Sequence, residues 1–341
     1  MSMKKRYLSF LLIMFGCIAF LAACGEKSQE DVMEKLTETM EKLEGYKAEA
    51  EMTMNTGQEE QRFNIDVWHQ KDNFYRVKLG DENGNKESQI ILKNEDGVYV
   101  LTPALEKSFQ FQTEWPDNGS QPYLYQSLVK DVLDDGEATF ESTEDHYVFK
   151  TKTNYHSNNS LPYQQILFDK KTYTPIAVRV LDKDDQALVE VQFTSFELNT
   201  EFAADDFAME KNMENLGDAP TMAENAEQED AFSVFYPLYT AGAEAIGKKE
   251  VSLEDGKRII LTYEGDKNFT LIQEKRLAAP TLQAPKAVEG EVVNLGFAVG
   301  ALSDQMIEWS LNGVEYKLAS DSLTKEEMIE VAQSIQGQEI K

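Results

Sequence analysis

Two Ser-x-x-Lys tetrads could carry nucleophilic chemistry in this chain. Ser127 with Lys130 forms one, and Ser322 with Lys325 forms the other. In exported penicillin-recognising enzymes the serine of such a tetrad is the nucleophile, but those enzymes also carry Ser-Asp-Asn and Lys-Thr-Gly elements. Neither element occurs here. Because Ser127 lies within one predicted helix and Ser322 leads into another, we interpret both as ordinary helix residues.

The histidines give no sign of a catalytic or metal site. His69, His146 and His156 are scattered, and none has a partner at the spacing of a metal site or a Ser-His-Asp triad. A Gly-x-Ser-x-Gly elbow, a phosphate-binding loop and a dinucleotide fingerprint are also missing from the sequence. We therefore expect a protein that is not an enzyme and that needs no cofactor.

Two acidic clusters resemble cation sites only in part. Asp81, Asn83 and Asn85 open like an EF-hand loop, whose sixth position must be glycine, but Lys86 stands there. The acidic run 182–185 lies between two strand-like segments and is most simply a solvated hairpin tip. We expect no metal site at either place.

The N-terminal segment contains the residue whose chemistry is clearest, Cys24. Basic residues at 4–6 precede an apolar run over 8–20, which is too short for a transmembrane span of roughly 20 residues and is typical of a signal peptide. The residues Leu21–Cys24 resemble the bacterial lipobox, in which the cysteine receives a diacylglyceryl group and the preceding peptide is removed. We predict an anchor on the extracytoplasmic face of the cell membrane. A secretory signal with a chance cysteine and an uncleaved anchor remain alternatives.

Cleavage before Cys24 would make 1–23 a lipoprotein signal peptide and 24–27 a short lipidated tether. It would also remove Cys17, so no thiol would be left for a disulfide or a nucleophile. The formal net charge of the whole chain is −28, and the removed charged residues are basic. A surface this acidic repels nucleic acid and anionic lipid headgroups, so attachment to the membrane must come from the acyl chains. We therefore expect no nucleic-acid partner.

An α+β domain is predicted over 28–210. Apolar residues recur at helical spacing within 32–43 and again within 121–133. Alternating apolar residues predict antiparallel strands over the segments 46–54, 63–67, 74–79, 89–92, 98–101, 147–152, 163–168, 176–181 and 188–196. Turns between strands are predicted at Asp96-Gly97 and Asp135-Gly136. We expect a curved antiparallel half-barrel with both helices on its concave side.

A second domain is predicted after a linker. Residues 211–230 lose the periodic pattern and are rich in Asn, Glu, Gly, Asp, Pro and Ala, as linkers are. Over 231–341 we expect a smaller α+β domain, which ends in a helix with a capping box at Thr324–Glu327. Its predicted strands cover the segments 232–239, 258–263, 269–273, 306–311 and 314–318.

The first domain contains soft apolar side chains that could line a ligand cavity. Methionine and phenylalanine form adaptable binding sites as readily as packed cores, so composition leaves both interpretations open. The residues that we expect to face inward are Met52, Met54, Phe63, Phe74, Leu92, Val100 and Phe109.

The spaced pattern of the first domain resembles the LolA/LolB-type lipoprotein carriers. The resemblance covers about residues 28–209 and includes the segments 66–68, 71–74, 96–103, 166–169, 191–193 and 206–207. It implies a LolA-like half-barrel that holds acyl chains in an apolar cavity. It also places Lys71 where the family has a basic residue, so Lys71 is a candidate for the cavity mouth.

The segments 263–274 and 309–316, with the helix after Lys325, are similar to a module of Bacillus-type lipoproteins. Together with the lipobox and the LolA-like domain, they resemble the YdcC-type sporulation lipoproteins of endospore formers. The resemblance implies a membrane-anchored protein that binds a lipid, another apolar ligand or a cell-envelope protein partner during sporulation or envelope assembly. The alternative is a structural or regulatory scaffold that binds a cell-envelope enzyme through its surface, without a ligand cavity.

Overall fold

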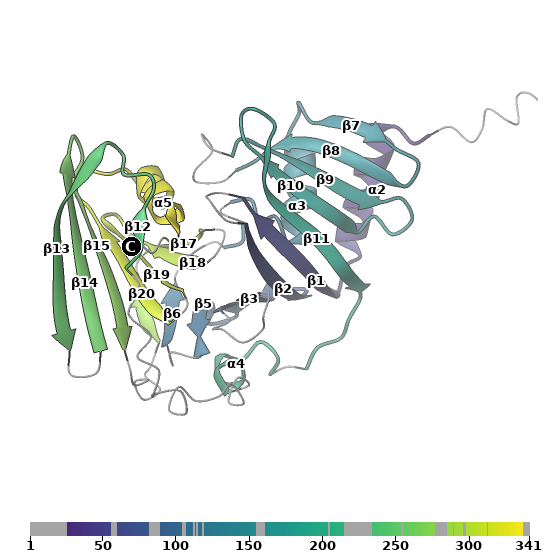
Figure 1. Ribbon diagram of the computed structural model, residues 1–341. Coiled ribbons are helices and arrows are strands. Elements are labelled where there is room, and N and C mark those ends of the chain that lie inside the picture. Colours follow the sequence, from purple (N-terminus) through teal and green to yellow (C-terminus); the bar gives the residue numbers. More distant parts are fainter. Residues whose placement is uncertain are drawn as a thin grey trace, which may run out of the picture.

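Two antiparallel sheets dominate the computed structural model (Figure 1). The structure describes residues 26–55, 60–81, 89–103, 107–111, 113, 115–117, 119–154, 161–203, 205–214, 234–253, 256–276, 285–288, 290–295, 298–311 and 313–336. Among these residues, no helix combines the length and the apolar composition that a membrane crossing requires. The predicted signal peptide and Cys24 lie outside the described residues.

Within these residues the larger sheet has twelve strands and stays open, because its end strands do not pair with each other. Neighbouring strands are antiparallel except the first two, which run parallel. In spatial order the strands are β16 (Lys286–Val288), β6 (Lys107–Phe111), β5 (Gly97–Thr102), β4 (Gln89–Asn94), β3 (Phe74–Asp81), β2 (Gln61–Gln70), β1 (Gly45–Met54), β11 (Ala187–Leu198), β10 (Pro175–Leu181), β9 (Tyr163–Asp169), β8 (His146–Lys152) and β7 (Thr139–Ser142). The predicted α+β fold with an open antiparallel sheet is confirmed.

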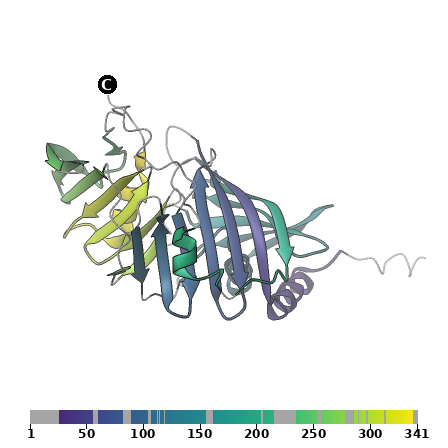
Figure 2. The same cartoon turned by 90° about the horizontal axis from the view of Figure 1, so that it is seen from below.

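Two helices cover one face of the larger sheet, here named the inner face. They are α2 (Gln29–Glu41) and α3 (Tyr125–Asp134), which lie together on one side of the strands (Figures 1 and 2). A capping box begins α2, because the Asp31 amide donates to the Ser28 hydroxyl (3.2 Å) and the Ser28 amide donates to the Asp31 carboxylate (3.0 Å). Val32 of α2 is fully buried in the core between helices and sheet.

The predicted turn at Asp135-Gly136 directly follows helix α3 and does not join two strands, so that part of the prediction is wrong. The Asp135 carboxylate accepts hydrogen bonds from the amides of Glu137 (3.0 Å) and Lys152 (2.7 Å), which ties the helix end to β8. An Asp-Gly dipeptide is common both at the end of a helix and in a hairpin turn. The dipeptide alone therefore does not distinguish these two structures.

The opposite, outer face of the larger sheet is covered in part by residues 201–203 and 205–214, here named the strap. The strap follows β11 and ends in the short helix α4 (Met209–Glu214), which lies apart from α2 and α3 and next to β5 (Figures 1 and 2). Phe207 and Met213 of the strap are buried against Leu92 of β4. The first residues of the predicted linker, 211–214, therefore belong to α4, and its remainder lies outside the described residues.

The smaller sheet is formed by the C-terminal part of the chain and has seven strands within the described residues. In spatial order they are β13 (Ala243–Leu253), β14 (Gly256–Gly265), β15 (Phe269–Arg276), β20 (Val314–Ala319), β19 (Met306–Leu311), β18 (Val299–Leu302) and β17 (Glu291–Asn294). Helix α5 (Lys325–Gln333) packs on this sheet, next to the paired short strands β12 (Tyr236–Pro237) and β21 (Ile335–Gln336). Of the predicted strand 232–239, the structure describes 234–239, and within these residues the strand is β12.

The two sheets pack against each other through specific contacts. Strand β16, which comes from the C-terminal part, extends the edge of the larger sheet beside β6. The Val299 amide donates to the Gln89 side-chain oxygen (2.8 Å), and Lys107 forms an ion pair with Glu315. Val292 of β17 is buried in the same core as the inner face. The C-terminal part thus closes one end of that core.

Candidate functional site

The structure divides the seven predicted cavity residues between the two faces of the larger sheet. The inner-face core contains or contacts Met52, Met54, Phe63, Val100 and Phe109. Phe74 and Leu92 belong to a separate apolar cluster beneath the strap. The expectation that all seven face the same way is therefore wrong for these two. The physical reason is the period of two in a strand, because Tyr75, the neighbour of Phe74, is the residue that faces the inner core.

The five inner-face residues behave as core. Met52, Met54 and Val100 are only 2% to 4% exposed. Phe63 is partly buried and also contacts the core of the C-terminal part. None of these residues lines any of the pockets described below.

His69 lies among the aromatic residues of the inner face and has a structural role. Its ring lies 4.5 Å from the Tyr75 ring and 5.4 Å from the Tyr46 ring, between centroids, and Nδ1 lies 3.0 Å from the Phe74 carbonyl oxygen. Burial lowers the pKa of His69 to about 4, so the ring is neutral at pH 7 and Nδ1 donates to that carbonyl. His146 lies in β8, and His156 is outside the described residues.

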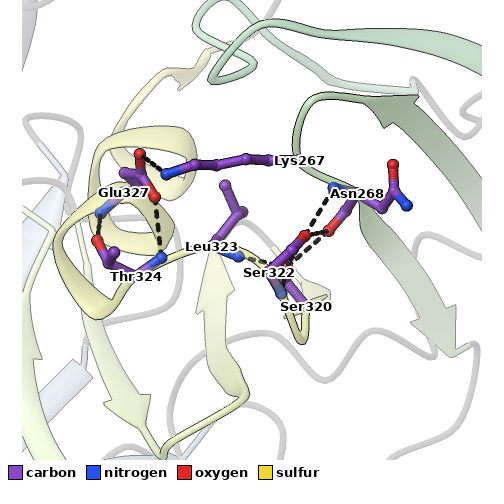
Figure 3. A network of polar contacts seen from close by, with 7 residues as sticks. All are labelled: Lys267, Asn268, Ser320, Ser322, Leu323, Thr324 and Glu327. Carbon is purple, nitrogen blue, oxygen red and sulfur yellow. Dashed lines mark hydrogen bonds and ion pairs between the residues drawn. The ribbon is translucent and has the colours of Figure 1, made fainter.

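Ser322 and Lys325 do not form a catalytic pair. The Asn268 amide donates to the Ser322 hydroxyl (2.7 Å), and this hydroxyl donates to the Asn268 carbonyl (3.0 Å), as Figure 3 shows. The Lys325 ammonium lies 3.3 Å from the Asp304 carboxylate. The predicted capping box is present, with the Glu327 amide donating to Thr324. These residues therefore join the start of α5 to the β14–β15 turn.

Ser127 and Lys130 line a pocket of about 440 Å³ beside α3, together with several carboxylates. The Gln121 amide donates to the Ser127 hydroxyl (2.8 Å). Asp131 also lines this pocket; the buried Gln164 side-chain amide donates to its carboxylate (2.6 Å), and burial raises the pKa of Asp131 to about 6. These hydrogen bonds give Ser127 and Asp131 structural roles, and no group of His, Cys, Asp and Glu in the described residues has the arrangement of a metal site.

The remaining predicted positions are on the surface or outside the described chain. Lys71 is exposed in the β2–β3 turn, and its ammonium lies 2.7 Å from the Glu44 carboxylate. The acidic run 182–185 is a tight turn between β10 and β11, as predicted. Residues 83–86, which resemble the start of an EF-hand loop, lie outside the described residues.

The outer face contains a pocket of about 710 Å³ at the margin of the strap. We name it the outer pocket. Its lining comes from β2, β3, the end of β4, the β4–β5 turn, β5, β6, the strap and the residue before β16. The lining residues are Gln70, Phe74, Asn94, Glu95, Asp96, Tyr99, Gln110, Ala203, Phe207, Ala208, Met209, Glu210 and Pro285.

Aromatic contacts form the apolar floor of the outer pocket. The Phe74 and Phe207 rings lie 5.7 Å apart between centroids, and the Phe207 ring lies 5.4 Å from that of Phe202. Phe202 in turn stacks on Trp68 at 5.5 Å. Tyr99 adds a buried ring, whose hydroxyl accepts a hydrogen bond from the Gln110 amide (3.0 Å). Such tilted and stacked pairs stabilise each other beyond simple area burial.

Polar contacts fix the strap over this floor. The Arg76 guanidinium lies 4.3 Å from the Trp68 ring centroid and donates to Asp66 (3.1 Å) and to Asn212 of α4 (2.6 Å). The Asn94 amide donates to the carbonyl of Phe207 (3.0 Å). The strap is therefore held at both ends of its buried stretch, while the sheet surface beyond it is left open as the outer pocket.

Sequence reasoning found only one lining residue of the outer pocket, Phe74. Tyr99, Phe207 and Met209 were missed, because no periodic pattern links the strap to the sheet. The available signal was the pair Phe202 and Phe207, two large apolar residues that follow the last strand of the first domain outside any periodic pattern.

Two solved structures are similar to this chain at low scores. The Pseudomonas aeruginosa MucA/MucB complex matches with a TM-score of 0.33 and 15% identity, over 91% of this chain and 99% of that chain. A LolA superfamily protein from Nitrosomonas europaea matches with a TM-score of 0.31 and 9% identity, over 55% of this chain and 100% of that chain. At these scores the similarities carry no argument about function.

Comparison of sequences identifies the family. The family model described as sporulation protein YdcC-like matches residues 4–207. The sporulation protein YdcC of Bacillus subtilis (strain 168) is 48% identical, over 99% of this chain and 100% of that protein. The chain belongs to the YdcC-like sporulation protein family.

Proposed function

We propose that this YdcC-like protein is a non-enzymatic binding protein of the cell envelope, anchored to the membrane through Cys24. In this proposal, the outer pocket takes up an apolar ligand or an apolar segment of a partner. The observation that carries the proposal is the pocket itself, because about 710 Å³ is enough for a small ligand or a few side chains. Its floor is aromatic, and the lining residues that the structure describes include no histidine, cysteine or serine.

The anchor is supported by the sequence Leu21–Cys24 and by the basic and apolar segments before it. Two acyl chains would hold the protein firmly, since each buried CH₂ contributes about 0.8 kcal/mol. We expect Cys24→Ala to prevent acylation and either release the protein from membranes or leave an uncleaved precursor. Membrane fractionation and mass spectrometry of the N-terminus measure both. A Cys24→Ala protein that is processed and fractionates like the wild type would refute the anchor.

Binding to the outer pocket is tested with a neutral apolar dye, N-phenyl-1-naphthylamine, on the soluble chain from Gly25 onward. We expect saturable binding near one-to-one stoichiometry and its loss in Phe74→Glu and in Met209→Glu. Leu133→Glu, which changes an exposed apolar residue of α3, is the matched control and should bind like the wild type. Urea unfolding of each variant separates lost binding from lost structure.

The alternative is a scaffold that binds a cell-envelope enzyme through its surface. The feature that favours it is β13, an edge strand of the smaller sheet, most of whose residues are exposed and whose Ile246 is 56% exposed. Edge strands of this kind can add a strand from a partner. If the dye shows no saturable binding to the wild type, the scaffold becomes the better hypothesis.

A further inference from the structure

The outer pocket has an unbalanced charge. Among the described residues that line it are the carboxylates Glu95, Asp96 and Glu210, and no lysine or arginine. All three residues are exposed at its rim. None of them forms an ion pair with a lysine or arginine in the part of the chain that the structure describes.

The carboxylates come from two separate elements and act on the same point. Asp96 belongs to the β4–β5 turn, whereas Glu210 belongs to α4. Burial first, and then the charges of Asp96 and Glu210, raise the pKa of the Tyr99 hydroxyl at the pocket floor. The two rim charges therefore act together on the pocket floor, although they come from different elements.

Two described cations of the outer face and the strap are already engaged elsewhere. Arg76 pairs with Asp66, and the Lys211 ammonium lies 2.7 Å from the Asp206 carboxylate and 3.0 Å from that of Asp205. Neither of these two cations therefore neutralises the rim carboxylates. A cationic group on an incoming molecule would meet the rim carboxylates while an apolar group reaches the floor.

This charge pattern also selects among apolar occupants. A phospholipid carries a phosphate, which the rim carboxylates would repel. A polypeptide can place an aromatic side chain and a basic side chain on neighbouring residues. An aromatic ring would stack on Phe74 and Phe207, and a lysine or arginine beside it would reach Glu95, Asp96 or Glu210.

We propose that the outer pocket binds a polypeptide segment of a partner protein in which an aromatic or large aliphatic side chain is flanked by lysine or arginine. The inference rests on the proposed function and adds the class and the charge of the occupant.

The test uses three short peptides, acetylated and amidated at their ends, which differ only beside a central phenylalanine. The first has a lysine on each side, the second has glutamines and the third has glutamates. Binding to the soluble chain from Gly25 onward is measured by titration calorimetry and by displacement of N-phenyl-1-naphthylamine. We expect the lysine peptide to bind at least about tenfold more tightly than the glutamine peptide and the glutamate peptide to bind more weakly still.

A triple variant of the rim isolates the charge. Glu95→Gln, Asp96→Asn and Glu210→Gln together should reduce the affinity for the lysine peptide by about tenfold and should reduce the affinity for the glutamine peptide much less. The matched control removes the same charge elsewhere on the exposed surface, through Glu141→Gln, Asp184→Asn and Glu197→Gln, and should have wild-type affinity. Added salt should weaken binding of the lysine peptide and leave binding of the glutamine peptide nearly unchanged.

The outcomes separate this inference from the proposed function. If neither dye nor any peptide binds, both are wrong. If the dye binds and the lysine and glutamine peptides have equal affinity or do not bind, the proposed function stands and the inference is overturned. If the control triple variant weakens binding of the lysine peptide as much as the rim variant does, the effect is caused by the net charge of the protein, and the inference is also overturned.

Discussion

The two faces of the larger sheet have similar side chains but different covers. On the inner face, α2, α3 and the C-terminal part close over a core in which Val67 and Val77 are fully buried. On the outer face, the strap crosses only part of the apolar surface and leaves Phe74 partly exposed at its margin. The extent of the cover, and not the hydrophobicity of the strands, therefore decides which face is a closed core and which is left partly open as the outer pocket.

The covers also differ in how they are held. The inner helices present buried apolar stripes, such as Val32 and Leu36 of α2. The strap has buried Phe207 and Met213, but its position depends in addition on the hydrogen bonds and ion pair of Arg76. Polar contacts at a partly exposed site are weaker than extensive apolar burial, so the outer cover should open more easily.

The largest expected effect is the response of the two faces to a charge. Met52→Glu places a carboxylate in the inner core and should lower the free energy of unfolding by about 4 kcal/mol or more. Phe74→Glu, at the margin of the outer pocket, should cost only about 1 to 2 kcal/mol, because the new carboxylate can reach water. Urea unfolding followed by circular dichroism measures both. Equal losses would mean that the outer pocket is part of a closed core.

Acid should destabilise the inner face through His69, whose folded pKa is about 4 against an ordinary value of 6.5. Between these values the unfolded chain binds the additional proton, so stability falls as the pH falls from 6.5 to 4. Asp131 has the opposite sign, because its folded pKa of about 6 lies above its ordinary 3.8. Its folded form binds the additional proton between pH 3.8 and 6, so its contribution rises as the pH falls.

These two contributions nearly offset each other in the wild type, and single variants should reveal them. Relative to the wild type, His69→Gln should gain about 2 to 3 kcal/mol in free energy of unfolding on going from pH 7 to pH 4.5, whereas Asp131→Asn should lose about 2 kcal/mol. Urea unfolding at the two pH values gives the differences. A wild-type pH dependence in both variants would show that neither group titrates as its burial requires.

The polar anchor of the strap should contribute less than the inner core. Arg76→Met removes an ion pair whose side chains are 12% and 29% exposed, and should cost about 2 kcal/mol. Hydrogen exchange at α4 should accelerate in this variant. The matched control is Arg179→Met, because the side chains of the Arg179–Glu190 ion pair are 41% and 45% exposed. This control should lower the free energy of unfolding by less than about 1 kcal/mol. Equal losses of stability in the two variants would mean that Arg76 stabilises the protein no more than an exposed ion pair does.

The strands and helices with clear periodicity could be predicted from the sequence. Which side of a strand faces the inner core could not always be predicted. Helix α2 and the capping box of α5 follow local rules and appear as expected. In β4, by contrast, the successive residues Ile90, Ile91 and Leu92 are all buried, because this part of the sheet is covered on both faces. Without alternation, sequence alone does not tell which residues face inward. Phe74 and Tyr75 pose the same problem, since both are aromatic.

The parts that sequence analysis missed depend on contacts between distant segments or on solvent. Strand β13 is exposed along most of its length, so it has no apolar alternation to detect. The outer pocket forms only when the strap, from after β11, returns to β3 and β5. The local sequence of the strap does not specify that return, because the contacts that hold it join distant residues, Arg76 with Asn212 and Asn94 with Phe207.

The smallest expected effect concerns the connection after the strap. Its composition predicts protease cleavage between Lys211 and Asp230, and because α4 extends to Glu214 we expect the first cut within 215–230. The two pieces should nevertheless elute together, because β16 pairs with β6 and Val299 bonds to Gln89 across the interface. Mass spectrometry locates the cut, and size-exclusion chromatography tests the association. The inner face should stay closed in the cleaved protein, because its cover includes Val292 from the C-terminal piece. The strap, by contrast, would lose its covalent connection to the C-terminal part. If the pieces separated without denaturant, the covalent link, and not the interface, would hold the C-terminal part over the inner core.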